Sequence, residues 1–158
     1  AGTENTAGIV GFGVACKIAM QTMAERAEKE TKLRDHLIQR LLNEIPYTRL
    51  NGHPTHRLPN NVNCCFRYIE GESLLLMLDQ MGICGSSGSA CTSGSLDPSH
   101  VLLAIGLPHE IAHGSLRLSL SGDSTLEEID FTVDELIRIV ERIRSMSPLY
   151  EDFVRKNK

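Results

Sequence analysis

The first 44 residues carry a helical repeat that limits the folds open to this chain. Apolar residues recur at steps of three and four, which predicts one long helix or two helices, ended by Pro46. The repeat consists of Ile9, Phe12, Cys16, Ala19, Met23, Leu33, Leu37 and Leu41. Pairs such as Glu28 and Lys32 have the favourable order for ion pairing four residues apart, which is typical of a solvated helix face.

The rest of the chain alternates short strand patterns with helical ones. Strands are predicted over 47–50, 62–69 and 114–120, and helices over 72–81, from 97 to about 105 and from Ser124 or Thr125 onward, with a short helix or frayed end over 150–158. In the last strand, leucines alternate strictly with polar residues, so one face is buried. This order predicts an α+β fold with helices packed on a mostly antiparallel sheet.

Composition excludes several partners. The net charge of −4 gives no basic surface for nucleic acid. The absence of Trp leaves few side chains that could stack on bases. Apolar runs such as 74–78 are shorter than the roughly 20 residues that cross a bilayer, so no membrane is expected. Five cysteines without CxxC spacing suit neither disulfides nor zinc, and they favour the cytoplasm. The spacing of His100, His109 and His113 is not that of a metal site.

Cys91 lies in a run of small residues, 85–95, with three Gly and five Ser. Such a loop has little side-chain mass to bury, which predicts an exposed and mobile thiol suited to nucleophilic chemistry. A flexible linker with an incidental cysteine has the same composition, so both interpretations stay open. The other four cysteines, Cys16, Cys64, Cys65 and Cys84, are expected to pack in the core.

Arg117 is the second unusual residue, because it lies within the alternating strand and must point away from the leucine face. Its planar guanidinium suits bidentate binding of a carboxylate. That carboxylate can belong to a substrate or to a structural Asp or Glu, and the pattern alone leaves both open.

Residues 86–102, which begin Ser-Ser-Gly-Ser-Ala-Cys-Thr-Ser-Gly-Ser, resemble the active-cysteine segment of NifS-type cysteine desulfurases, in the class V aminotransferase family. The segments 2–5, 57–63, 70–75 and 112–120 support the resemblance in the same order. It implies the small C-terminal domain of a fold-type-I, pyridoxal-phosphate-dependent enzyme that acts as a homodimer. Residues 1–45 would form a linking helix region that begins with a cofactor-phosphate segment, and 46–158 the small domain with its catalytic loop.

The resemblance also implies roles for three residues. Cys91 would take sulfur from L-cysteine as a persulfide, releasing L-alanine, and pass it to an acceptor such as an iron–sulfur scaffold protein. Arg117 would bind the substrate carboxylate. Thr3 would reach the cofactor phosphate of the partner subunit.

The family's Schiff-base lysine has no counterpart here, because the five lysines, at 17, 29, 32, 156 and 158, lie in helical charge patterns or at the tail. We therefore expect that lysine outside this chain, and an isolated chain that is inactive. Two alternatives remain. One is a selenocysteine lyase or cysteine sulfinate desulfinase, which shares the fold, and the other is a sulfur-carrier domain without cofactor.

Overall fold

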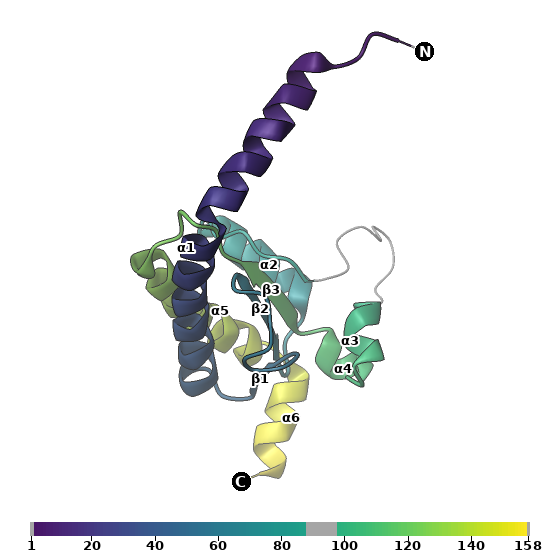
Figure 1. Cartoon of the computed structure of the whole chain (residues 1–158). Coiled ribbons are helices and arrows are strands. Elements are labelled where there is room, and N and C mark those ends of the chain that lie inside the picture. Colours follow the sequence, from purple (N-terminus) through teal and green to yellow (C-terminus); the bar gives the residue numbers. More distant parts are fainter. Residues whose placement is uncertain (1, 88–97, 158) are drawn as a thin grey trace.

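The computed structural model describes residues 2–87 and 98–157, in which six helices and three strands form (Figure 1). The elements are α1 (Thr6–Glu44), β1 (Thr48–Leu50), β2 (Asn61–Phe66), α2 (Gly71–Gln80), α3 (His100–Ala104), α4 (His109–Ala112), β3 (Ser115–Ser119), α5 (Leu126–Ser145) and α6 (Pro148–Lys156). All the predicted helices and strands are present, and the first helical repeat forms one helix. The sequence did not predict α4, which is only four residues long.

The sheet has the order β1-β2-β3, and both strand pairs are antiparallel, as predicted. Its register sets Cys64 opposite Leu116 and Asn63 opposite Arg117. Because side chains alternate along a strand, Cys64 and Leu116 share one face, while Asn63 and Arg117 share the other. The first of these two faces is the apolar one.

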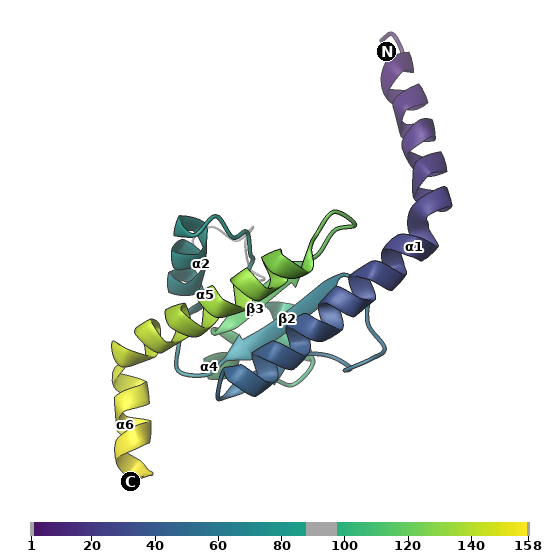
Figure 2. The same cartoon turned by 90° about the vertical axis from the view of Figure 1, so that its left-hand side faces the viewer.

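The main core fills the space between that apolar face and the helices α1, α2 and α5. Figure 2 shows α1 and α5 side by side across the sheet. The predicted apolar repeat includes three leucines in the C-terminal half of α1. These are buried in the main core: Leu33, Leu37 and Leu41. Thr125 caps α5, because its Oγ1 accepts from the Glu128 N–H at 3.2 Å while its own N–H donates to the Glu128 carboxylate at 2.9 Å.

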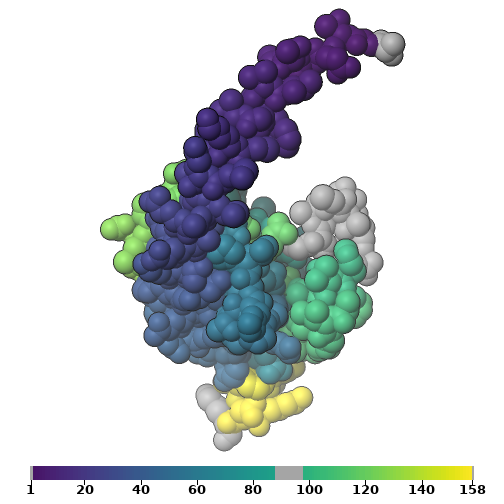
Figure 3. All heavy atoms as spheres, in the orientation of Figure 1, coloured from purple at the N-terminus to yellow at the C-terminus, as the bar shows by residue number. Residues whose placement is uncertain are grey.

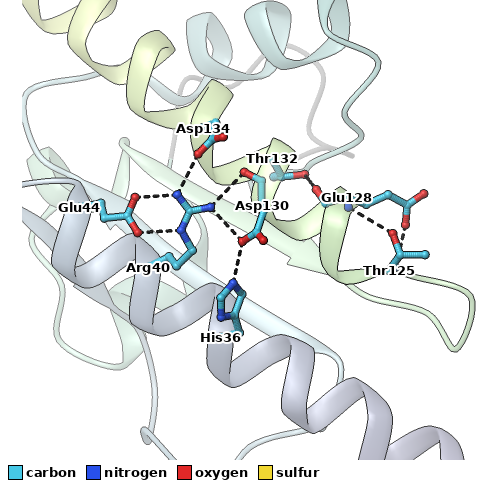
Figure 4. A network of polar contacts seen from close by, with 8 residues as sticks. All are labelled: His36, Arg40, Glu44, Thr125, Glu128, Asp130, Thr132 and Asp134. Atoms are coloured by element: carbon cyan, nitrogen blue, oxygen red, sulfur yellow. Dashed lines mark hydrogen bonds and ion pairs between the residues drawn. The ribbon is translucent and has the colours of Figure 1, made fainter.

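An ionic network joins α1 to α5 at the edge of this core (Figure 4). Arg40 donates to both carboxylate oxygens of Glu44 and also to Asp130 and Asp134 on α5. His36 Nε2 lies 2.7 Å from Asp130 Oδ1, the oxygen that also accepts a hydrogen bond from Arg40. The hydrogen bond from His36, followed by that from Arg40, holds the pKa of Asp130 below its ordinary value. The network thus fixes one helix against the other.

The N-terminal half of α1 extends beyond the sheet and contacts little else in the described part of the chain (Figure 3). Its apolar side chains are exposed, among them Ile9, Phe12 and Met23. By length and composition alone this helix could cross a membrane, since an 18-residue window has a mean hydropathy of 1.4. The expectation of no membrane, which rested on shorter apolar runs such as 74–78, therefore stays a prediction. A helix that covers a protein surface can have the same composition.

The cysteines divide into two groups. Cys64 and Cys65 are buried, as predicted, whereas Cys16 and Cys84 are exposed, so the prediction of core packing was wrong for these two. Cys16 lies on the projecting half of α1, where no described residue covers it, and Cys84 follows the turn at Gly82. Cys65 faces away from the main core.

A second, smaller apolar cluster lies on that other face of the sheet. It contains Cys65, Leu102, Leu107 and Ala112, and in it α4 packs on β2 while α3 packs on α4. Figure 3 shows α3 and α4 as a lobe at the side of the molecule.

We expect the ionisation of Cys64 to make the protein less stable in alkali. Burial raises the pKa of this thiol from about 9 to about 12, with Arg57 opposing the shift. Between these values the unfolded chain loses the proton while the folded chain keeps it, so the stability present below pH 9 falls by up to about 1.4 kcal/mol per pH unit. Urea unfolding at pH 8 and 10.5 measures the fall.

The fall should be smaller in Cys64→Ala, and unchanged in the exposed control Cys84→Ala. Because burial also raises the pKa of Cys65, some pH dependence should remain in Cys64→Ala. An equal fall in the Cys64 variant and in wild type would contradict the assignment.

Candidate functional site

Ser86 and Ser87, near the start of the small-residue loop, are bound to the edge of β3. The Ser86 N–H donates to the Arg117 carbonyl at 3.1 Å, and the Arg117 N–H donates to the Ser86 carbonyl at 2.6 Å. The Ser115 hydroxyl donates to the Ser87 carbonyl at 2.9 Å. The described part of this segment ends at Ser87, so Cys91 lies outside the described residues. The start of its loop is nevertheless fixed beside Arg117.

Gly85 allows this close approach. A Cβ at this position would lie 2.9 Å from Leu116 Cδ1 and 3.3 Å from Leu75 Cδ2. With a larger residue, either the buried Leu116 side chain or the segment itself would have to shift. Gly85 thus has a packing role at the start of the loop, which the sequence did not suggest.

The far end of the loop is also anchored. Pro98 and Ser99 are buried, and α3 begins immediately after them. Leu102 of α3 lies in the small cluster with Cys65. The loop therefore runs from the edge of β3 to the lobe formed by α3 and α4.

Arg117 has its side chain exposed on the sheet face opposite the main core, as the alternation predicted. Over residues 2–87 and 98–157, its guanidinium makes no ion pair or side-chain hydrogen bond. The structural ion pair that the sequence left open is thus not found in the described residues. Asn63 is the cross-strand neighbour of Arg117. The sequence analysis did not single it out, although alternation along the strands could have placed it on the same face as Arg117.

Thr3 precedes α1, whose N-terminal half extends beyond the sheet to which Arg117 belongs (Figure 1). It is exposed, two residues before Asn5, whose side chain accepts from the Gly8 N–H at 3.0 Å and caps the helix. A helix N-terminus with a nearby hydroxyl is chemically suited to an anion such as a phosphate. Arg117 and Thr3 therefore belong to two separate places on the chain.

None of the described residues forms a group of three or more His, Cys, Asp and Glu arranged to hold a metal ion. His100, His109 and His113 are exposed around α3 and α4.

Comparison with known proteins identifies the relatives of this chain. The family model described as aminotransferase class-V matches residues 1–131. Cysteine desulfurase IscS of Clostridium botulinum is 58% identical over 160 residues, which cover 100% of this chain and 40% of that protein. Cysteine desulfurase IscS of Methanosarcina thermophila is 58% identical over 149 residues, 94% of this chain and 37% of that protein.

A solved structure has the same fold. The X-ray structure of a NifS-like protein from Rickettsia africae ESF-5 matches with a TM-score of 0.78 and 30% identity, over 89% of this chain and 36% of that one. The α+β arrangement of an antiparallel sheet with packed helices is thus that of a domain of these fold-type-I enzymes. The present chain spans about two fifths of the length of its relatives.

Proposed function

The chain belongs to the aminotransferase class-V family, and we propose that the protein containing it removes sulfur from L-cysteine, releases L-alanine and keeps the sulfur as a persulfide on Cys91. The observation that supports the proposal is the backbone pairing of Ser86 with Arg117, which holds the start of the segment that leads to Cys91 beside the strand that carries Arg117. Two relatives that are 58% identical and are named cysteine desulfurases support it.

Arg117 would orient the substrate. Two of its N–H groups can donate to the two oxygens of the cysteine carboxylate, and the hydrogen bonds of β3 hold the backbone from which it projects. Cys91 follows Ser87 by four residues, so covalent geometry keeps their Cα atoms within about 14 Å of each other. A thiolate within that reach would attack the substrate sulfur as the carbon–sulfur bond breaks.

Pyridoxal phosphate would supply the electron sink that makes this bond breakable. In this chain, the hydroxyl of Thr3 near the start of α1 suits one contact to its phosphate, and we keep Thr3 as the proposed cofactor-binding residue. As the resemblance implies, we propose that Thr3 meets the cofactor of the partner subunit in a homodimer.

We propose that the Schiff-base lysine lies in the three fifths of the relatives' length that this chain does not span. Lys29 and Lys32 are bound to the Gly122 carbonyl and to Glu28, and Lys17 is exposed on α1. The isolated chain would then be inactive. Residues 1–45 would link the small domain, 46–158, to the remainder of the protein. The free Cys64 and Cys65 agree with a reducing cytoplasm.

The position of the transferred sulfur tests the proposed function. The whole protein would be turned over with L-cysteine in the absence of reductant, digested and analysed by mass spectrometry. We expect one added sulfur atom on the peptide that contains Cys91, together with free alanine, and neither in a sample without cysteine. Added sulfur on another residue would contradict the role of Cys91, and the absence of alanine would contradict the reaction.

Arg117→Lys should weaken substrate binding without unfolding the protein. Lysine keeps the charge but cannot make two parallel hydrogen bonds, so we expect KM for cysteine to rise about 10- to 100-fold with a smaller change in kcat. Arg49→Lys is the matched control, because Arg49 is exposed on the same face of the sheet. An unchanged KM in Arg117→Lys would contradict carboxylate binding.

A further inference from the structure

The sheet face that carries Arg117 also carries two amide side chains in the same row. Asn63 is directly opposite Arg117 in the register of β2 and β3, so their Cβ atoms leave the same face of the sheet about 5 Å apart. Asn51 comes directly after β1, and its N–H donates to the Asn63 carbonyl at 2.9 Å. Asn51, Asn63 and Arg117 therefore follow one another across the sheet.

The amide of Asn51 fixes the amide of Asn63. Asn51 Nδ2 donates to Asn63 Oδ1 at 2.6 Å and to Cys65 Sγ at 3.1 Å. Asn51 is itself held firmly, because it is only 5% exposed and its carbonyl accepts from Arg57. Since Asn63 Oδ1 is turned toward Asn51, the amide nitrogen of Asn63 is on the other side of the group. This nitrogen makes no hydrogen bond to any of the described residues.

Stability alone does not account for an amide at position 51. Asn51 Oδ1 is buried, and within the described part of the chain it has no hydrogen-bond partner. A buried acceptor without a partner destabilises a protein, and an apolar side chain of similar size would avoid this loss. Positioning of the Asn63 amide gives a reason for the arrangement, because local costs of this kind are typical of functional sites.

The charge of this face suits an anion. Arg49 and Arg117 both lie on it, and none of the three described strands contains an Asp or Glu. Asn63 is half-buried and Arg117 is exposed, so the longer side chain of Arg117 rises beside the shorter amide. A carboxylate can accept about four hydrogen bonds, and a guanidinium that binds it side-on supplies two of them. A carboxylate held by Arg117 can thus accept another from Asn63.

Arg117 also lies between Asn63 and the start of the cysteine loop. Asn63 pairs with it from β2, and Ser86 pairs with it from the opposite side of β3. An amino acid whose carboxylate binds between Arg117 and Asn63 can therefore direct its own side chain toward the segment that leads to Cys91. This orientation is the one that transfer of sulfur to Cys91 requires.

We propose that the amide nitrogen of Asn63 donates a hydrogen bond to the carboxylate of the cysteine substrate, beside Arg117, and that Asn51 holds this amide in place. The inference rests on the proposed desulfurase function and adds to it a residue that selects substrates with a carboxylate. Asn63 is then a substrate-binding residue. Asn51 acts through Asn63 and is a positioning residue.

The test uses the whole protein with its cofactor bound, and circular dichroism checks the folding of each variant. Asn63→Ala removes the donor. Asn63→Asp keeps an oxygen that can accept from Asn51 but puts a negative charge in place of the donor. Asn61→Ala and Asn61→Asp are the matched controls, because Asn61 lies on the same face of β2, opposite Ser119. Steady-state kinetics give KM and kcat for L-cysteine.

Two inhibitors separate carboxylate binding from all other contacts, because L-alanine has the carboxylate and cysteamine lacks it. We expect Asn63→Ala to raise KM for L-cysteine and the inhibition constant of L-alanine about tenfold, with less than about a twofold change in kcat and in the inhibition constant of cysteamine. Asn63→Asp should raise the first two constants about 100-fold, since its carboxylate would pair with Arg117 and repel that of the substrate. Both controls should stay within about threefold of wild type.

The role of Asn51 has its own test. Asn51→Ala should raise KM for L-cysteine with little change in kcat, and adding it to Asn63→Ala should raise KM no further, because Asn51 acts only through Asn63. Additive effects on KM would overturn positioning by Asn51.

Unchanged KM in both Asn63 variants would overturn the proposal. Equal rises in the inhibition constants of L-alanine and cysteamine would also overturn it, because they would show a general structural effect instead of carboxylate binding. A wild-type protein that forms no alanine from L-cysteine would overturn the desulfurase function itself, and this inference with it.

Discussion

Cys91→Ser should lower alanine formation from L-cysteine on the order of 10³-fold or more and abolish the persulfide. The serine hydroxyl is not ionised at neutral pH and attacks sulfur poorly, so the step in which the sulfur changes carrier loses its nucleophile. Serine is nearly isosteric with cysteine, and the surrounding run already contains five serines, so folding should be unaffected. Steady-state assays of alanine, with circular dichroism as the check on folding, measure the effect.

Cys84→Ser is the matched control, because Cys84 is also exposed and precedes the same loop. It should keep close to wild-type activity. Full cysteine activity in Cys91→Ser would contradict the proposed role. Retained turnover of selenocysteine together with lost turnover of cysteine would instead favour a selenocysteine lyase, in which the thiol is not required.

Gly114→Ala should destabilise the protein by more than about 3 kcal/mol or prevent folding. A Cβ on Gly114 would lie 2.1 Å from the Phe66 carbonyl oxygen and 3.3 Å from that of Ile69. The conflict is with backbone at the end of β2, so no side chain can rotate away to relieve it. The Gly114 carbonyl also accepts from the Phe66 N–H at 2.8 Å, and a shift would strain this bond. Denaturant unfolding of the whole protein measures the loss.

Gly11→Ala provides the contrast within the same chain. No atom lies within 4 Å of a Cβ at Gly11, which is in the interior of α1, and alanine favours helix by about 1 kcal/mol over glycine. Its unfolding midpoint should be equal to or above that of wild type. If Gly114→Ala unfolded at the wild-type denaturant concentration, the backbone packing described here would be incorrect.

The helices and strands followed from the sequence where a local signal was strong. Thr125 and Glu128 form the capping box that starts α5, and the alternation around Arg117 gave both the strand and its buried face. The helix α4 escaped prediction because it has four residues and depends on the Pro108 carbonyl, which accepts from the N–H groups of Ile111 and Ala112. No periodicity can reveal so short an element.

The apolar repeat of α1 predicted burial correctly only for the part of the helix that packs on the sheet. Leu37 and Cys16 occupy equivalent apolar positions of one repeat, yet the first is fully buried and the second exposed, because the sheet lies under only one half of α1. The pairing of Ser86 with Arg117 was not predictable, since a Gly/Ser segment carries no strand signal. The roles of Cys91, Arg117 and Thr3 remain predictions for the experiments above.

The small apolar cluster under α3 and α4 has a consequence for dynamics. Among the described residues, four buried side chains hold this lobe, against nineteen in the main core, and the sheet separates the two groups. Local unfolding of the lobe would therefore need much less free energy than global unfolding and would leave Arg117 in place. Amide hydrogens of α3 and α4 should accordingly exchange with solvent through sub-global opening, whereas those of α5 should exchange only through global unfolding.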